Sequence, residues 1–226
     1  MFFKLLNKKL KLRIGSDHHS YSWYIKQKEE LENLNIDPVE EKEFFSIVNN
    51  SKYMDILVDS LENLREAFLY ESYIHGILHN LRVCLYSFYL GNKYNVDERL
   101  MKLAIYAALY HDIGRVDDSR DDYHGGRSAM LLPRLRLDID EEELKVLQVA
   151  IKCHSLHDRE FKNNIDGIKD IEKCRMLFNI LKDSDALDRV RLVGAPYVKI
   201  DMFRLEESKR ILLLSYKIEC WYTKKS

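Results

Sequence analysis

Helix-breaking residues are scarce in this chain of 226 residues, which contains only 8 glycines and 3 prolines. Because glycine and proline most often interrupt helices, their scarcity leaves few places to end one. We therefore predict an all-α fold. With 46% hydrophobic residues the chain can bury one substantial core, so we expect a single domain over residues 1–226.

A surplus of either charge is also lacking. The 36 basic and 37 acidic side chains leave a formal net charge of -1. A balance this close gives no overall field that would attract a long nucleic acid. A small anionic substrate held by a few local cations is compatible with it.

Paired cysteines are missing as well. Cys84, Cys153, Cys174 and Cys220 lie far apart, and no two of them form a CxxC pair. No secretory signal precedes them, so we expect reduced thiols and a cytoplasmic protein.

No hydrophobic run is long enough to cross a membrane. The segment Met1–Leu12 mixes Phe and Leu with Lys, and its apolar part is short and interrupted. We expect it to form an ordinary amphipathic first helix, with binding to an anionic membrane or a partner as the alternative.

Apolar residues recur at helical spacing along much of the chain. Asp37-Pro38, Asp97 and Asp170 are plausible helix starts, and the charged run 116–122 is typical of an exposed loop. We predict helices over about 40–69 with a break near 50–51, and over 71–90, 97–111, 141–155, 170–191 and 202–223.

Four of these helices carry histidine or aspartate beside or at the end of an apolar face. Burying such groups is costly unless something compensates. Neutral imidazole and carboxylate together suit borderline divalent metals, so the pattern indicates a metal site inside a helical bundle. The residues concerned are His79, His111 with its neighbour Asp112, His154, and Asp185 with Asp188.

These residues resemble the motifs of the HD-domain metal-dependent phosphohydrolases. His79 stands in HNLRV, His111-Asp112 in HDIGR and Asp185 in DSDALDR. The similarity covers residues 73–191. Each motif alone is weak evidence for the family, and the resemblance is specific because the motifs occur in the right order, spacing and helical context. It implies an HD-domain helical bundle, extended by helices at both ends, in which His79, His111, Asp112 and Asp185 bind one divalent metal.

The resemblance also implies a second metal position. His124 in HGGRSA and His154 in CHS fall where binuclear members of the family place further ligands, and Asp112 would then bridge two ions. For His124 the alternative is a loop histidine beside Tyr123, and for His154 a hydrogen-bonded histidine at a helix end. We expect His75 and Asp188 to support ligands. The resemblance implies one or two divalent ions, and it does not decide which of Mn, Fe, Ni, Co, Zn or Mg they are.

The function that the resemblance implies is attack of metal-activated water on a phosphoester of a nucleotide or another small phosphorylated molecule. Asp112 and Arg115 would be catalytic, and Arg115 stands where the family motif usually has lysine, facing phosphate. Arg127 and Arg82 are further candidates for substrate contact, with an internal salt bridge as the alternative for Arg82. A nuclease of the same family and a non-catalytic module that binds a nucleotide or a partner are the competing interpretations. The sequence predicts no oligomeric state.

Overall fold

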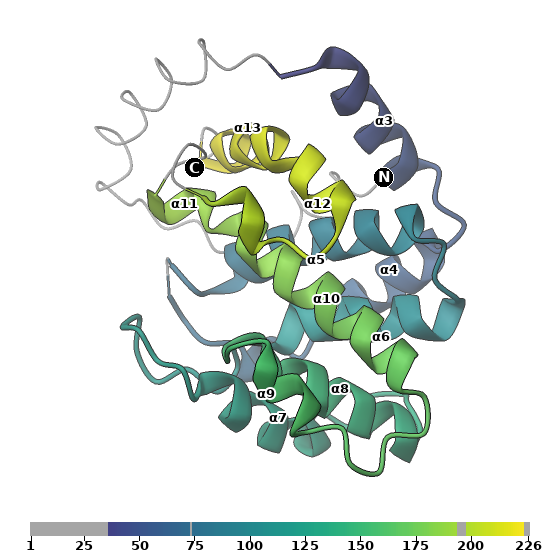
Figure 1. Ribbon diagram of the computed structural model, residues 1–226, viewed down its shortest axis with the longest axis vertical. Helices are drawn as coiled ribbons and strands as arrows, with labels where there is room; N and C mark the ends of the chain where they lie inside the picture. The colour runs from purple at the N-terminus through teal and green to yellow at the C-terminus, as the bar shows by residue number, and fades with distance from the viewer. Residues whose placement is uncertain (1–35, 73, 194–197, 224–226) are drawn as a thin grey trace.

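The computed structural model describes residues 36–72, 74–193 and 198–223. These residues form helices and no strand, which confirms the prediction of an all-α fold (Figure 1). None of the helices within these ranges is long and apolar enough to cross a membrane. The helix predicted over Met1–Leu12 lies outside the described residues.

Four helices form the centre of the molecule. α5 (Ile77–Lys93) packs on α6 (Glu98–Tyr110), and α10 (Ile171–Asp188) contacts both of them. α8 (Glu141–His154) packs on α10 and α6, and in Figure 1 α10 crosses the middle of the bundle. The apolar residues between these helices are almost completely buried, so the helices have well-defined positions relative to one another.

Shorter helices cover this centre. α7 (His124–Leu135) packs on α8, α3 (Pro38–Asn49) on α5, and α4 (Met54–Glu62) on α6. At the carboxyl end of the chain, α13 (Leu212–Thr223) packs on α10. The remaining short elements are η1 (Glu66–Phe68), α9 (Arg159–Lys162), α11 (Val190–Val193), η3 (Ile200–Met202) and α12 (Glu206–Arg210).

Aspartates cap the amino ends of three helices that carry predicted ligands, α6, α8 and α10. The Asp97 carboxylate accepts a hydrogen bond from the Leu100 amide, and Asp170 accepts one from the Lys173 amide. Asp140 and Glu143 form a reciprocal capping box at the start of α8. These caps fix where α6, α8 and α10 begin, and the predicted starts at Asp37-Pro38, Asp97 and Asp170 are confirmed.

α7 was not among the helices predicted from the sequence. The helix contains a glycine pair near its start and Pro133 near its end. A Cβ at Gly125 would lie 2.6 Å from the Ile151 carbonyl oxygen, so a residue with no side chain lets α7 approach α8. The close approach of two helices, which no local pattern shows, explains this glycine.

Other predicted boundaries were also wrong. α5 begins at Ile77 and continues through Gly91 to Lys93, because Gly91 accommodates the Met101 side chain of α6 and does not end the helix. The helix predicted over 202–223 is divided into η3, α12 and α13, and the one over 40–69 into α3, α4 and η1.

Candidate metal centre

Five helix ends converge on one buried volume. α6 and α8 end at it with His111 and His154, and the last turn of α10 brings Asp185. α5 and α7 begin beside it, with His79 and His124 in their first turns, and Asp112 follows α6 directly. The structure thus brings all six predicted ligands together, and only Asp185 is more than marginally exposed.

Four of these side chains form a first cluster. The Nε2 atoms of His79 and His111 lie 3.0 Å apart. Asp185 Oδ1 lies 3.4 Å from His79 Nε2 and 3.9 Å from His111 Nε2. Asp112 Oδ2 lies 3.6 and 3.7 Å from the same two nitrogens. The ligand atoms of His79, His111 and Asp185 therefore lie close enough together to share one ion, and Asp112 Oδ2 lies beside both imidazole nitrogens.

The other oxygen of Asp112 faces a second cluster. Asp112 Oδ1 lies 3.0 Å from His124 Nε2 and 3.8 Å from His154 Nε2, and these two nitrogens are 2.9 Å apart. Oδ1 is buried and accepts no hydrogen bond from the described residues. A buried carboxylate oxygen without a hydrogen bond is costly, and a bound cation would remove that cost.

Every histidine of the two clusters is held by its other ring nitrogen. His79 Nδ1 pairs with Asp188 Oδ2 at 2.7 Å. The Nδ1 atoms of His111 and His154 lie 2.9 and 2.6 Å from the carbonyl oxygens of Ala108 and Ile151, and that of His124 pairs with the Asp121 carbonyl. With Nδ1 as the donor, each Nε2 presents its lone pair to the centre, which is how proteins orient metal-binding histidines.

The chain resembles an HD-domain protein. Among solved structures, it is similar to the crystal structure of a predicted HD superfamily hydrolase from an uncultured Thermotogales bacterium. That comparison covers 76% of this chain and 89% of the other, with 21% sequence identity and a TM-score of 0.43. No protein-family model and no curated protein matches the sequence. The resemblance therefore rests on the HD motifs, the all-α fold and the buried set of histidines and aspartates.

Asp188 supports the first cluster from behind. Its carboxylate accepts two hydrogen bonds from Arg82, at 2.6 and 3.0 Å, and lies 3.3 Å from Arg191. Burial alone would raise the pKa of Asp188, but the two guanidinium groups and His79 lower it to about 2. Arg82 is thus engaged in the internal salt bridge that the sequence offered as the alternative to substrate contact.

The other two predicted arginines lie nearer to solvent. Arg115 donates from Nε to Asp112 Oδ2 at 3.0 Å, so it fixes the Asp112 carboxylate. Arg127 donates to the Gly114 carbonyl oxygen at 2.8 Å and pairs with Asp121. Both side chains therefore support the walls of the site, and of these two only Arg115 lines its cavity.

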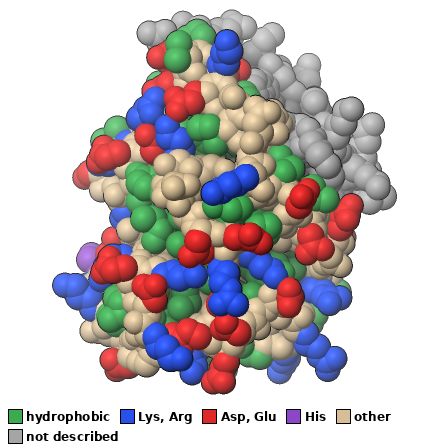
Figure 2. All heavy atoms as spheres, turned by 90° about the vertical axis from the view of Figure 1, so that its right-hand side faces the viewer, with side chains coloured by type: hydrophobic (Ala, Val, Ile, Leu, Met, Phe, Trp, Pro, Cys, Tyr) green, Lys and Arg blue, Asp and Glu red, His purple; other side chains and the backbone are tan. Residues whose placement is uncertain are grey.

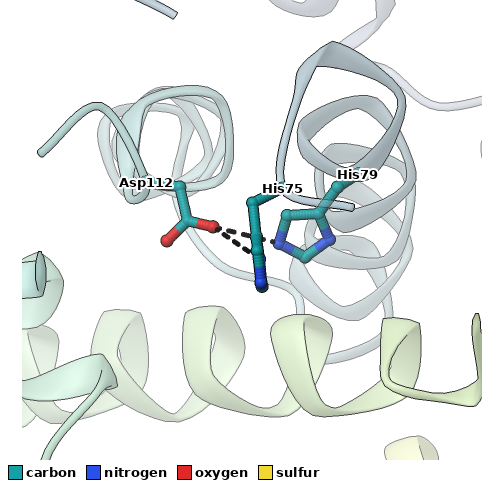
Figure 3. Close-up of side chains that lie close together, drawn as sticks. All are labelled: His75, His79 and Asp112. Atoms are coloured by element: carbon teal, nitrogen blue, oxygen red, sulfur yellow. Dashed lines mark ion pairs between the residues drawn. The ribbon is translucent and has the colours of Figure 1, made fainter. Parts of the chain in front are cut away.

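His75, which was expected only to support the ligands, lies within reach of the Asp112 carboxylate. Figure 3 shows its ring and that of His79 directed at the Asp112 carboxylate, and His75 Nδ1 is 3.3 Å from Asp112 Oδ2. The same nitrogen is 3.2 Å from Arg191 Nη2. His75 precedes α5, so its position depends on how that segment folds back and could not be read from helical spacing.

Two protonation states suit cation binding. Burial lowers the pKa of His111 to about 3, so its imidazole is neutral near pH 7. Burial opposes ionisation of Asp112, yet the surrounding histidines hold the pKa of this carboxyl well below its usual range. Neutral imidazole and ionised carboxylate are the forms that bind metals.

A cavity of about 560 Å³ gives access to the two clusters. Asp185, His124 and His154 line it, together with two segments that are far apart in the sequence: the loop 115–122 and the chain after α10. Two cations of that second segment, Arg189 and Arg191, were not predicted as site residues, although DSDALDR includes the first of them.

Proposed function

We propose that this protein is a metal-dependent hydrolase that cleaves a phosphoester of a small phosphorylated molecule. The observation that carries the proposal is the placement of Asp112 between two groups of ligands. Oδ2 faces His79 and His111, and Oδ1 faces His124 and His154. One carboxylate that offers a separate oxygen to each group is suited to bridge two ions.

The donor atoms fit such ions. The imidazoles of His79, His111, His124 and His154 with the carboxylates of Asp112 and Asp185 suit Mn, Fe, Co, Ni or Zn, whereas Mg prefers oxygen ligands and retained water. The buried Oδ1 of Asp112, which accepts no hydrogen bond from the described residues, fits a cation at the second group. When bound, a pair of divalent ions supplies an activated water and a clamp for phosphate oxygens.

The protein's own residues hold the reacting groups in place. Asp188 and three backbone carbonyls fix the histidine rings, and Arg115 fixes the Asp112 carboxylate. Preorganised groups of this kind need no rearrangement when negative charge develops on a phosphate. We propose that the guanidinium of Arg115, which lines the cavity, stabilises that charge.

A small substrate agrees with the dimensions and the charge of the site. The cavity is the size of a small-molecule pocket. Arginines and aspartates together line the cavity, and acidic and basic side chains also lie intermixed on the face shown in Figure 2, so neither the cavity nor this face forms a broad basic surface. A polynucleotide substrate would need such a surface near the site.

The test is turnover by protein whose metal content has been measured. Protein loaded with Mn is expected to hydrolyse p-nitrophenyl phosphate. Asp112→Ala and His111→Ala should lose at least about 100-fold in kcat/KM, because each removes a predicted ligand. Circular dichroism checks that both variants stay helical. His157→Ala, at an exposed position outside the site, is the matched control and should retain full activity.

Two results would replace the proposal. Cleavage of single-stranded DNA in preference to phosphomonoesters would favour the nuclease interpretation. Stoichiometric binding of Mn or Zn with no cleavage of any phosphoester would favour a non-catalytic module.

A further inference from the structure

Four arginines line the cavity, and they differ in how firmly they are paired. The shortest ion-pair distances are 3.0 Å for Arg115, 3.3 Å for Arg191, 3.4 Å for Arg120 and 3.9 Å for Arg189. Arg115 and Arg191 also donate to backbone carbonyl oxygens. Arg189 has the longest ion pair of the four, and its side chain is 45% exposed, so its guanidinium can bind a ligand at little cost.

Arg189 lies beside the first group of ligands. It caps the carboxyl end of α10, one turn after Asp185, and its Nη2 is 3.9 Å from Asp185 Oδ2. The other oxygen of Asp185 faces His79 Nε2 at 3.4 Å. An anion held at the candidate metal centre would therefore lie within reach of Arg189, whose planar fork matches two oxygens of a phosphate group.

The loop 115–122 has more acidic than basic side chains, and Asp118, Asp121 and Asp122 line the cavity beside Arg115 and Arg120. Asp121 pairs with Arg127, and Asp122 pairs with Arg120. Asp118 is therefore the carboxylate of this loop that lines the cavity without an ion pair to any of the described residues. Asp118 accepts a hydrogen bond from the Ser72 hydroxyl at 2.6 Å, which ties the loop to the segment before α5. Like charges facing one another cost free energy, so a second or third phosphate directed at this loop would be repelled. Hydroxyl groups, in contrast, could donate hydrogen bonds to these carboxylates.

We infer that Arg189 binds the phosphate of a phosphomonoester whose remaining part is uncharged and carries hydroxyl groups, and that the acidic loop excludes diphosphates and triphosphates. This inference rests on the proposed function and narrows it to one class of substrate. Arg189 would then bind phosphate together with Arg115, the first candidate from the sequence, in place of Arg82 and Arg127.

Equilibrium binding tests the inference without turnover. Inorganic phosphate and pyrophosphate are titrated by calorimetry into protein loaded with Mn, whose metal content is measured for each variant. Arg189→Ala should weaken phosphate binding by about 10- to 100-fold, as expected for loss of a charge-assisted hydrogen bond, with metal content unchanged. Arg189→Lys should recover part of the loss. Arg134→Ala removes the same charge from the exposed far end of α7 and should bind phosphate as the wild type does.

A second set of titrations tests whether the acidic loop excludes diphosphates. Wild-type protein should bind phosphate more tightly than pyrophosphate, and Asp118→Asn with Asp122→Asn should raise pyrophosphate affinity several-fold. Phosphate affinity of Arg189→Ala within about twofold of wild type, or tighter binding of pyrophosphate by wild type, would overturn the inference. If phosphate binds through Arg189 but no ester is cleaved, the proposed hydrolase activity fails while the anion site stands. If esters are cleaved equally well by Arg189→Ala, the assignment of Arg189 fails and the proposed function stands.

Discussion

Removing the Asp188 carboxylate should destabilise the protein severely. Asp188 is completely buried and pairs with Arg82, Arg191 and His79. In Asp188→Ala, the guanidinium of Arg82 stays buried without its partner. Breaking a buried ion pair in this way costs about 3–5 kcal/mol. At roughly 2–4 °C per kcal/mol for a chain of this size, the unfolding midpoint should fall by about 6–20 °C.

Urea denaturation of the metal-free protein, followed by circular dichroism, measures this cost. In Arg82→Met, Asp188 keeps Arg191 and His79 as partners, so this variant should lose less stability, about 1–3 kcal/mol. The double variant buries no unpaired guanidinium from Arg82. It should therefore be at least about 2 kcal/mol more stable than the sum of the two losses predicts.

Two results would refute this reasoning. Asp188→Ala within about 1 kcal/mol of wild type would show that the buried charges are compensated by other contacts. Strict additivity in the double variant would show that Arg82 and Asp188 act independently. A separate readout concerns the metal: because Asp188 orients His79, its loss should weaken metal binding by about 10- to 100-fold.

Three further predictions concern the site. Gly125→Ala should weaken metal binding at His124 and His154, because the new Cβ would lie 3.0 Å from His154 Nδ1. In Gly126→Ala the new Cβ would meet nothing within 4 Å, so this control should bind metal normally in the same calorimetric titration. The metal-free protein should lose stability as the pH falls from about 6.5 towards 3, by up to about 1.4 kcal/mol per pH unit, because the unfolded chain then holds a proton on His111 that the folded chain lacks. Urea titrations at several pH values over this range measure the free energy of unfolding. Its dependence on pH should be weaker in His111→Leu than in the wild type and unchanged in His157→Leu. Elemental analysis of His124→Ala should find one ion per chain, and two would contradict its role as a ligand.

The features that sequence predicted best are local ones. Asp97 and Asp170 begin their helices because a carboxylate next to the first turn binds free backbone amides, and this depends on neighbours in the chain. Asp185 was predicted as a ligand because it lies beside the apolar face of its helix. In the structure Asp183 faces away and accepts hydrogen bonds from the backbone amides of Arg204 and Leu205.

What the sequence missed depends on contacts between distant segments. Gly125 and Gly91 lie inside helices, and each is at a place where another helix approaches closely. His75 reaches Asp112 because the segment before α5 folds back to the loop after α6, where Ser72 bonds Asp118. Arg189 likewise becomes the candidate for phosphate binding only when its ion-pair distance is compared with those of the other arginines that line the cavity.

The most direct test of a two-ion centre bridged by Asp112 is anomalous diffraction from crystals of the protein loaded with Mn or Zn. We predict two anomalous peaks, one among His79, His111 and Asp185 and one between His124 and His154, with a different oxygen of Asp112 bound to each. A single peak that leaves His124 and His154 without an ion would contradict the two-ion centre, and no peak at all would contradict the metal site itself.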